Sequence, residues 1–450
     1  MSQATQPPAQ ARPQRDIAAL IGRGVVIPSP EHLFIAQDVP LEAIAPGVVL
    51  HPFTRLSGGG TRLDAGAVIG ASGPATLENA WVGKGAVVGR QGAVTLRDTT
   101  VGAGAILGAG IAENSVFLGR EGDAPDFTTG AGFRTRKGTL YEEGANSAQF
   151  TDTKMTILLP WVTLGSNLNW CYLLVAGGTG PQMGAFTEIG SGAIHFNFTP
   201  RGDKATGSLL GNVCDGVFLR TPRLFIGGNV SLIGPIVAAP GAMTPAGGRH
   251  AGQLSPGMNA PLTPPAADAL EAFDPEVYGG ILPVYQSQVR MIGELSALVA
   301  WYEHIRLRLA GTDASRAALY QRGLDMVWMN LRERIHQMSE FAARVEHSVV
   351  RLERTRPADA RIAQQRALVK RWPELAALLA ERAGQATPPP PELIRALEQV
   401  ASQDTGAAYT LMIRALPEEA VRKGRDWLRR VAGTVAADDI LMAIPALAVR

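Results

Sequence analysis

The sequence predicts a parallel β-solenoid followed by an all-α region, and two observations carry this prediction. Residues 1–265 hold 42 of the 51 glycines but only 35 charged side chains, whereas residues 266–450 hold 9 glycines and 47 charged side chains. The first part also repeats itself with a period near 18, and the second places apolar residues at helical spacing. The whole-chain averages, 18% charged residues and a net charge of +2, therefore combine two unlike regions.

The repeat is clearest in two segments that align without gaps, LENAWVGKGAVVG from Leu77 and LRDTTVGAGAILG from Leu96. Leu63, Val82 and Val101 lie 19 residues apart, and each is followed six residues later by another aliphatic residue. A period built from sixes is typical of a left-handed parallel β-helix, in which short strands on three faces close one coil. Aliphatic residues would fill the prism, and glycine, asparagine or aspartate would suit its bends.

The composition divides the chain into four expected segments. We expect a disordered polar tail over 1–20, the left-handed β-helix over 21–245, a Pro/Gly linker over 246–267 and a helical domain over 268–450. Residues 121–150 break the period and are expected to form a loop or an irregular coil.

The helical region predicts one long helix and several short ones. Its stripe of apolar residues alternates spacings of four and three over four heptads, which is typical of a coiled coil or a long helical hairpin. The stripe consists of Leu324, Trp328, Leu331, Ile335, Met338, Ala342, Val345, Val349 and Leu352. Shorter helices are expected over 359–383, 390–402 and 417–433. This region is the expected contact surface for a protein partner.

Charge, hydropathy and cysteine content exclude several classes of protein. The near-neutral charge argues against a nucleic-acid-binding protein that depends on a basic surface. No apolar run reaches about 18 residues, so no membrane span is expected. The two cysteines cannot form a disulfide framework, and the N-terminus lacks the apolar core of a secretory signal, so we expect a cytoplasmic protein. The histidines show no metal-ligand spacing, and no metal site is predicted.

The stretch from Thr187 to Gly228, TEIGSGAIHFNFTPRGDKATGSLLGNVCDGVFLRTPRLFIGG, resembles a known family. It is similar to left-handed β-helix hexapeptide-repeat acyltransferases, and most to the acetyltransferase half of the bifunctional UDP-N-acetylglucosamine pyrophosphorylase / glucosamine-1-phosphate acetyltransferase. In this resemblance Asn197 falls on a substrate-contacting Asn, Phe198 replaces the adjacent Tyr, Lys204 lies in the basic loop, and Thr221 lies near the cofactor. The resemblance implies a homotrimer that uses acetyl-CoA or another acyl-CoA.

A second segment, GSNLNWCYL from Gly165, resembles the catalytic segment of that family. Asn169 matches an Asn of the segment, but the catalytic His falls on Trp170, and an indole cannot accept a proton from the attacking amine. The candidate substitute is His195, two residues before Asn197 and on the same face of an expected strand. If the chain is active, His195 would be the base, Asn197 would position a sugar acceptor, and Arg201 or Lys204 would bind its phosphate.

Two other functions remain open. The lost His favours a non-catalytic trimeric scaffold or binding module, with Trp170 available to stack on a ligand. The segment LSGGGTRL from Leu56 resembles the phosphate loop of sugar-nucleotide pyrophosphorylases, although a repeat coil, AGAVIG, follows it where such a loop needs a helix.

Overall fold

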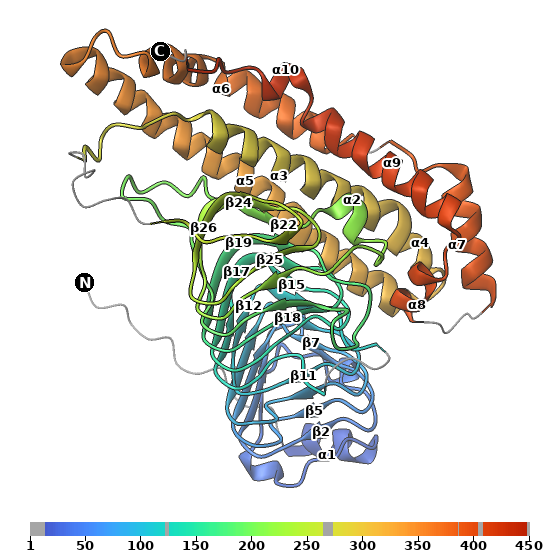
Figure 1. Ribbon diagram of the computed structural model, residues 1–450. Coiled ribbons are helices and arrows are strands. Elements are labelled where there is room, and N and C mark those ends of the chain that lie inside the picture. The colour runs from blue at the N-terminus through green and yellow to red at the C-terminus, as the bar shows by residue number, and fades with distance from the viewer. Residues whose placement is uncertain (1–13, 122–125, 264–272, 386, 404–407, 448–450) are drawn as a thin grey trace, which may run out of the picture.

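The structure is a computed structural model that describes residues 14–121, 126–263, 273–385, 387–403 and 408–447. A parallel β-solenoid forms the N-terminal part, and a bundle of helices lies against it (Figure 1). Strands pair in parallel throughout the described part of the solenoid, with three faces to a coil. The predicted parallel β-helix and the predicted helical region are both confirmed.

The strands fall on three faces, which we number in chain order within a coil. The first face consists of β1 (Phe34–Ile35), β3 (Thr54–Ser57), β6 (Ala75–Glu78), β9 (Val94–Arg97), β12 (Gly110–Glu113), β14 (Phe133–Thr135) and β21 (Ile194–Phe196). The second consists of β4 (Arg62–Leu63), β7 (Trp81–Val82), β10 (Thr100–Val101), β13 (Ser115–Phe117), β15 (Thr139–Tyr141) and β22 (Ser208–Leu210). Four longer strands run from the first face into the second: β17 (Thr151–Leu158), β19 (Leu168–Val175), β24 (Ser231–Ala238) and β26 (Arg249–Leu254).

The third face is made of two sheets, which single parallel bridges at Thr129 connect. One contains β2 (Val49–Leu50), β5 (Val68–Ile69), β8 (Val87–Val88) and β11 (Ile106–Leu107). The other contains β16 (Asn146–Ser147), β18 (Val162–Leu164), β20 (Thr187–Ile189), β23 (Phe225–Ile226), β25 (Ala242–Thr244) and β27 (Gly257–Met258).

The strand register matches the repeat that the sequence predicts. Leu63 pairs with Val82, and Val82 pairs with Val101, so each 19-residue step advances the chain by one coil. All three side chains are buried in the prism. Asn79 and Asp98 stand at the bend between the first and second faces with φ of 48° and 46°. Their short polar side chains suit this left-handed backbone, which is unfavourable for most residues.

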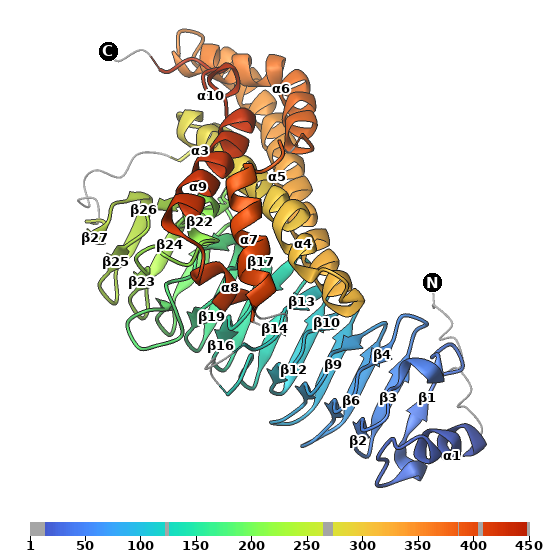
Figure 2. The same ribbon diagram turned by 90° about the vertical axis from the view of Figure 1, so that its right-hand side faces the viewer.

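Three expected boundaries differ from the structure. Within the expected tail, residues 1–13 lie outside the described residues, but α1 (Gln14–Gly22) is a helix whose Ile17 and Leu20 are buried at the end of the first coil (Figure 2). An open end of a solenoid exposes apolar residues, and α1 covers them. Residues 133–147 form the regular strands β14 to β16, not an irregular coil. The strands β26 and β27 lie inside the expected linker, because its glycines and prolines occupy bends of further coils.

The remaining helices are short turns on the solenoid and a larger C-terminal group. The solenoid carries η1 (Pro30–His32), η2 (Leu41–Ala43) and α2 (Val213–Gly216). The C-terminal group consists of α3 (Leu282–Trp301), the π-helical turn η4 (Tyr302–Arg306), α4 (Leu307–Ala310), α5 (Ala314–Thr355), α6 (Arg361–Ala383), α7 (Pro391–Gln403), α8 (Tyr409–Arg414), α9 (Glu418–Val435) and α10 (Asp438–Leu441). The bounds of α6, α7 and α9 agree with the three shorter helices expected.

The long helix α5 and its neighbour α6 form an antiparallel hairpin. Ser348 donates to Gln365 at 2.7 Å, and further from the connection Trp372 donates to Ser339 at 3.0 Å. From Leu324 to Val345 the apolar stripe of α5 packs into one continuous core with the solenoid, α3 and α6, and Val349 and Leu352 form a smaller cluster with Val277 and Ile362. The stripe therefore buries against the rest of its own chain. The helices lie over the second face of the later coils, while the first coils project beyond them (Figure 2).

Among the described residues, no helix has both the length and the apolar character needed to cross a membrane.

Candidate functional site

The predicted base, His195, lies inside the solenoid. It is on β21, next to β19, and its side chain is 3% exposed. Its Nδ1 atom is 2.7 Å from the carbonyl oxygen of Cys171, and its Nε2 atom is 2.7 Å from Oγ of Ser208. Because a carbonyl oxygen only accepts, Nδ1 carries the proton and Nε2 accepts from the serine hydroxyl. Burial lowers the pKa of His195 to about 4, so the ring is neutral near pH 7.

Trp170 occupies the neighbouring coil and also points inward. Asn169 pairs with Ile194, which places Trp170 alongside His195 in the stack of inward residues. Its indole N–H donates to the carbonyl of Ala193 at 3.0 Å, and the side chain is fully buried. The position that the resemblance gives to the catalytic His is therefore part of the core. Both side chains, Trp170 and His195, face the interior and not a surface where an acceptor could bind.

The predicted phosphate-binding loop, Asn197 to Lys204, is docked on the helical region. Arg201 donates through Nε to the carbonyl of Val277 at 2.7 Å, and its guanidinium lies 5.1 Å from the ring centre of Tyr278. The carbonyl of Lys204 accepts a hydrogen bond from Arg334 of α5 at 3.3 Å. Arg201 is thus engaged in holding the loop.

The other two predicted residues lie apart. Phe198 is exposed at the outer surface of this loop. Thr221 is buried in the segment between α2 and β23, where the adjacent Arg220 pairs with Glu418 of α9 at 2.6 Å. The structure therefore places Thr221 beside the α8–α9 junction and not in the loop that contains Asn197.

The glycine loop that resembles a phosphate loop is a bend of the solenoid. Gly58 and Gly60 connect β3 to β4, and no helix follows them. A Cβ atom on Gly58, whose φ is 87°, would lie 2.2 Å from Oδ1 of Asn79 in the next coil. These glycines therefore allow close stacking of coils, and the helix N-terminus that a phosphate loop requires is absent from this described segment.

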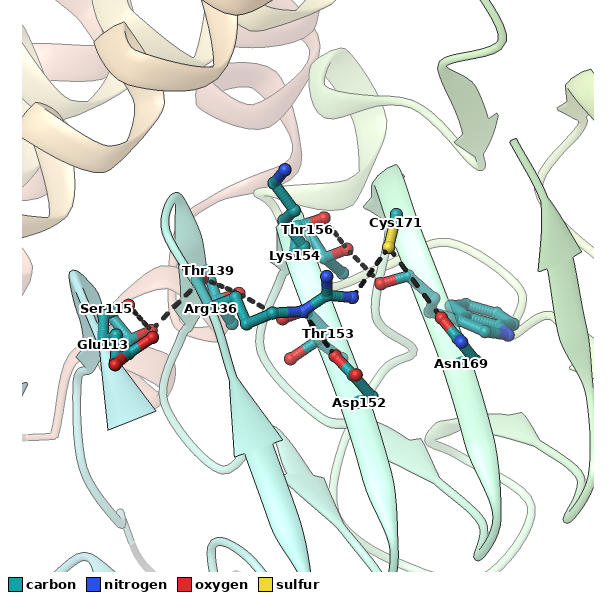
Figure 3. A network of polar contacts seen from close by, with 11 residues as sticks. Glu113, Ser115, Arg136, Thr139, Asp152, Thr153, Lys154, Thr156, Asn169 and Cys171 are labelled. Carbon is teal, nitrogen blue, oxygen red and sulfur yellow. Dashed lines mark hydrogen bonds and ion pairs between the residues drawn. The ribbon is translucent and has the colours of Figure 1, made fainter. Parts of the chain in front are cut away.

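Two of the predicted residues do meet, on the outer side of the first face. Asn169 lies on β19 two residues from Cys171 and its Oδ1 atom is 3.9 Å from the Cys171 thiol, while the Asn197 side chain lies close enough to the same thiol to influence its pKa. Arg136, which follows β14, donates through Nε to Asp152 at 2.7 Å and through Nη2 to Sγ of Cys171 at 3.3 Å (Figure 3). Burial raises the pKa of the Cys171 thiol, so the group stays protonated near pH 7.

Lys154 completes this cluster, which we call the Cys171 site: Arg136, Asp152, Lys154, Asn169, Cys171 and Asn197. Lys154 pairs in register with Cys171, and its ammonium lies 5.9 Å from the ring centre of Tyr172. Sequence reasoning missed Arg136, Asp152, Lys154 and Cys171. The available signal was the alternation in TDTKM, where Asp152 and Lys154 place charge on one side of an otherwise apolar coil.

A groove lies between the bend that follows this site and the long helix α5. Met155 and Tyr172 directly follow Lys154 and Cys171 at the bend, with φ of 46° and 66°. The groove has a volume of about 490 Å³, and Lys137, Met155, Trp328, Arg332 and His336 are among its lining residues. Tyr172 donates its hydroxyl to Glu333 of α5 at 3.4 Å, which ties the bend to the helix.

The Cys171 site is rich in hydrogen-bond donors and cations. Asn169 and Asn197 offer amides, Lys154 offers an ammonium, and the thiol of Cys171 is protonated. The carboxylate of Asp152 is paired with Arg136. Such a set can bind a ligand with phosphate or hydroxyl groups, whereas acyl transfer would also require an accessible general base.

Comparison with known proteins identifies no family for this chain. No family model matches the sequence, and no curated protein matches it. A solved structure of the polySia specific acetyltransferase NeuO overlaps 49% of this chain and 92% of its own, with 10% sequence identity and a TM-score of 0.15. An overlap of this quality carries no argument about fold or function.

Proposed function

We propose that this chain is a binding protein that holds a sugar phosphate or a nucleotide sugar at the Cys171 site and does not catalyse acyl transfer. The observation that carries the proposal is the location of His195. The one base that the sequence offered is sealed in the core with both ring nitrogens engaged. What remains at the surface is a set of donors suited to binding.

Charge and shape support a phosphate-bearing ligand. Arg136 is fixed in orientation by Asp152, and Lys154 stands in the adjacent coil. A fixed guanidinium beside an ammonium favours a phosphate or pyrophosphate group. The amides of Asn169 and Asn197 would then bond to sugar hydroxyls, and the groove toward Trp328 offers room for the rest of the ligand.

Titration calorimetry with UDP-N-acetylglucosamine and with glucosamine 1-phosphate tests the binding. We expect Lys154→Met to weaken binding by roughly tenfold, the effect of losing one charge-assisted hydrogen bond. Arg249→Met is the matched control, because Arg249 is an exposed cation further along the first face. Binding of neither ligand, or equal loss in the two variants, would refute the proposal.

Acyl transfer is tested separately with acetyl-CoA and the same sugar phosphate, measured by release of free thiol. We expect no turnover above background. Turnover that disappears in His195→Gln would instead favour the acyltransferase function and the acyl-CoA cofactor that the resemblance implies.

A second candidate function is a homotrimeric scaffold. Four apolar side chains are exposed around the outer surface of β21 and β24: Ile194, Phe196, Phe198 and Ile233. Because Phe196 pairs with Ile233, this patch extends over neighbouring coils and is suited to contact with a second copy of the chain. Light scattering should give three times the monomer mass if the trimer exists, and Phe196→Ser should then shift the mass toward the monomer. A monomer in both proteins would reject the scaffold.

A further inference from the structure

A second cleft lies between the second face of the solenoid and the start of α5. In this region the first coils emerge from beneath the helices (Figure 2). The volume of the cleft is about 670 Å³, within the usual range for a small-molecule site. The second face of the solenoid forms one wall, and the start of α5 forms the other. We call it the Trp81 cleft, and its lining includes Arg62, Trp81, Lys84, Ser315, Arg316 and Tyr320.

Arg62 is held rigidly at the solenoid wall. Its Nε atom donates to Asp64 at 2.8 Å, and the same carboxylate accepts from the indole N–H of Trp81 at 2.8 Å. The guanidinium lies 4.7 Å from the ring centre of Trp81. Its Nη2 atom reaches across the cleft and donates to Oγ of Ser315 at 2.9 Å. A cation fixed in this way loses little freedom when it binds an anion.

The opposite wall is the N-terminus of the 42-residue helix α5. The first N–H groups of a helix have no carbonyl partner within the helix, and the helix dipole makes this end attractive to anions. The Asp313 side chain accepts from the N–H of Arg316 at 2.9 Å, and Asp313, Ser315 and Arg316 at this end of the helix all line the cleft. Arg62 and the end of α5 therefore converge at Ser315.

The floor supplies a polar group without a partner. Tyr320 is 3% exposed, and its hydroxyl forms no hydrogen bond with any described residue. The neighbouring carboxylates of Glu143 and Glu121 already accept hydrogen bonds from other groups. Glu143 accepts from Arg306 at 2.7 Å, and Glu121 accepts from the backbone of Tyr409 at 2.8 Å. Because Tyr320 lines the cleft, its hydroxyl is open to this space and available to bond to a ligand there.

We propose that the Trp81 cleft binds a small phosphorylated polyol, with the phosphate between Arg62, Lys84 and the N-terminus of α5. Lys84 is exposed at the mouth and has no ion-pair partner among the described residues. A hydroxyl group on the body of the ligand completes the hydrogen bonding of Tyr320. This site is independent of the Cys171 site, since the two share no lining residue.

Titration calorimetry with glucose 6-phosphate, inorganic phosphate and glucose as probes tests the proposal. Glucose 6-phosphate should bind more tightly than inorganic phosphate, and glucose alone should bind least, because the charge provides most of the affinity. Lys84→Met should weaken binding of glucose 6-phosphate by about tenfold, and Tyr320→Phe by about fivefold. Tyr320→Phe should leave the affinity for inorganic phosphate unchanged, because phosphate does not reach the floor.

Two control variants distinguish binding in this cleft from binding elsewhere on the protein. Arg55→Met removes an exposed cation from the first face of the same coils and should not change binding. Because the Cys171 site is itself proposed to hold sugar phosphates, the titration is repeated in Lys154→Met: any binding of glucose 6-phosphate at that site is lost in this variant, and binding in the Trp81 cleft should persist. If glucose 6-phosphate does not bind, or if Arg55→Met and Lys84→Met weaken it equally, the proposal is wrong. If Lys154→Met alone weakens it, the ligand belongs to the Cys171 site and the Trp81 cleft is not a phosphate site.

Discussion

Glu294 of α3 accepts a hydrogen bond from the backbone N–H of Val213 at 2.7 Å, and this contact joins the helical region to α2 on the solenoid. Burial of the carboxyl raises its pKa to about 7, against 4.5 in the unfolded chain. The folded protein therefore holds a proton at this group over a pH range in which the unfolded chain has lost it. The stability from this group is fully present below the unfolded pKa and is lost as pH rises through the folded pKa.

We expect Glu294→Gln to remove this pH dependence. The amide oxygen of Gln can still accept from Val213, but the side chain does not titrate. Between about pH 4.5 and about pH 8, the free energy of unfolding of the variant should rise relative to the original chain by up to about 3 kcal/mol. Urea unfolding at the two pH values measures this difference. If the difference in free energy of unfolding between the variant and the original chain does not change with pH, the raised pKa of Glu294 is contradicted.

Arg306 also joins the helical region to the solenoid, and its removal should lower the stability of the protein. Its Nη1 and Nη2 atoms bind Glu143 and Glu142 at 2.7 Å each, and all three side chains are buried. Arg306→Met would leave two uncompensated carboxylates, and we expect it to lower the free energy of unfolding by about 3–5 kcal/mol. Adding Glu142→Gln and Glu143→Gln to this variant should recover part of the loss. No recovery would mean that the packing around Arg306, and not its charge, accounts for the loss of stability.

His195 should make the protein sensitive to acid. Burial lowers its pKa to about 4, against 6.5 in the unfolded chain, so the unfolded chain binds a proton between these values and the folded chain does not. The free energy of unfolding should therefore fall by about 3 kcal/mol from this group as pH drops from 6.5 to 4. In His195→Gln this component should be absent, which urea unfolding of both proteins at about pH 6.5 and about pH 4.5 would detect. If the free energies of unfolding of the two proteins change with pH in parallel, the prediction is wrong.

The solenoid could be predicted because each coil carries its own signal. Leu63, Val82 and Val101 repeat at a fixed spacing, and the same residues stack in register. The long helix was equally visible, because the spacing of its apolar residues is local.

The docking of the helices and the location of the site could not be predicted in this way. Arg306 and Glu143 are 163 residues apart, and no local pattern pairs them. His195 was expected beside Asn197 because residues two apart share a face of a strand, but alternation does not say which side faces the core, and β21 ends at Phe196, before Asn197. His195 faces the core, where it is hydrogen-bonded to Ser208, which lies 13 residues later in the chain and on another face of the solenoid. The Cys171 site needs residues from four successive coils, so it exists only once the coils stack.

A last prediction concerns two glycines for which substitution by alanine should have opposite effects. A Cβ atom at Gly177 would lie 1.7 Å from the carbonyl oxygen of Pro160, a backbone atom that cannot move without disturbing the coil. Gly177→Ala should therefore lower the free energy of unfolding by about 3 kcal/mol or more. Gly433 lies in α9 and a Cβ there would meet nothing within 4 Å, so Gly433→Ala should raise the free energy of unfolding by about 0.5–1 kcal/mol through the better helix propensity of alanine. Urea unfolding of both variants should show opposite signs, and a loss of stability in Gly433→Ala would mean that this part of α9 is more closely packed than the structure indicates.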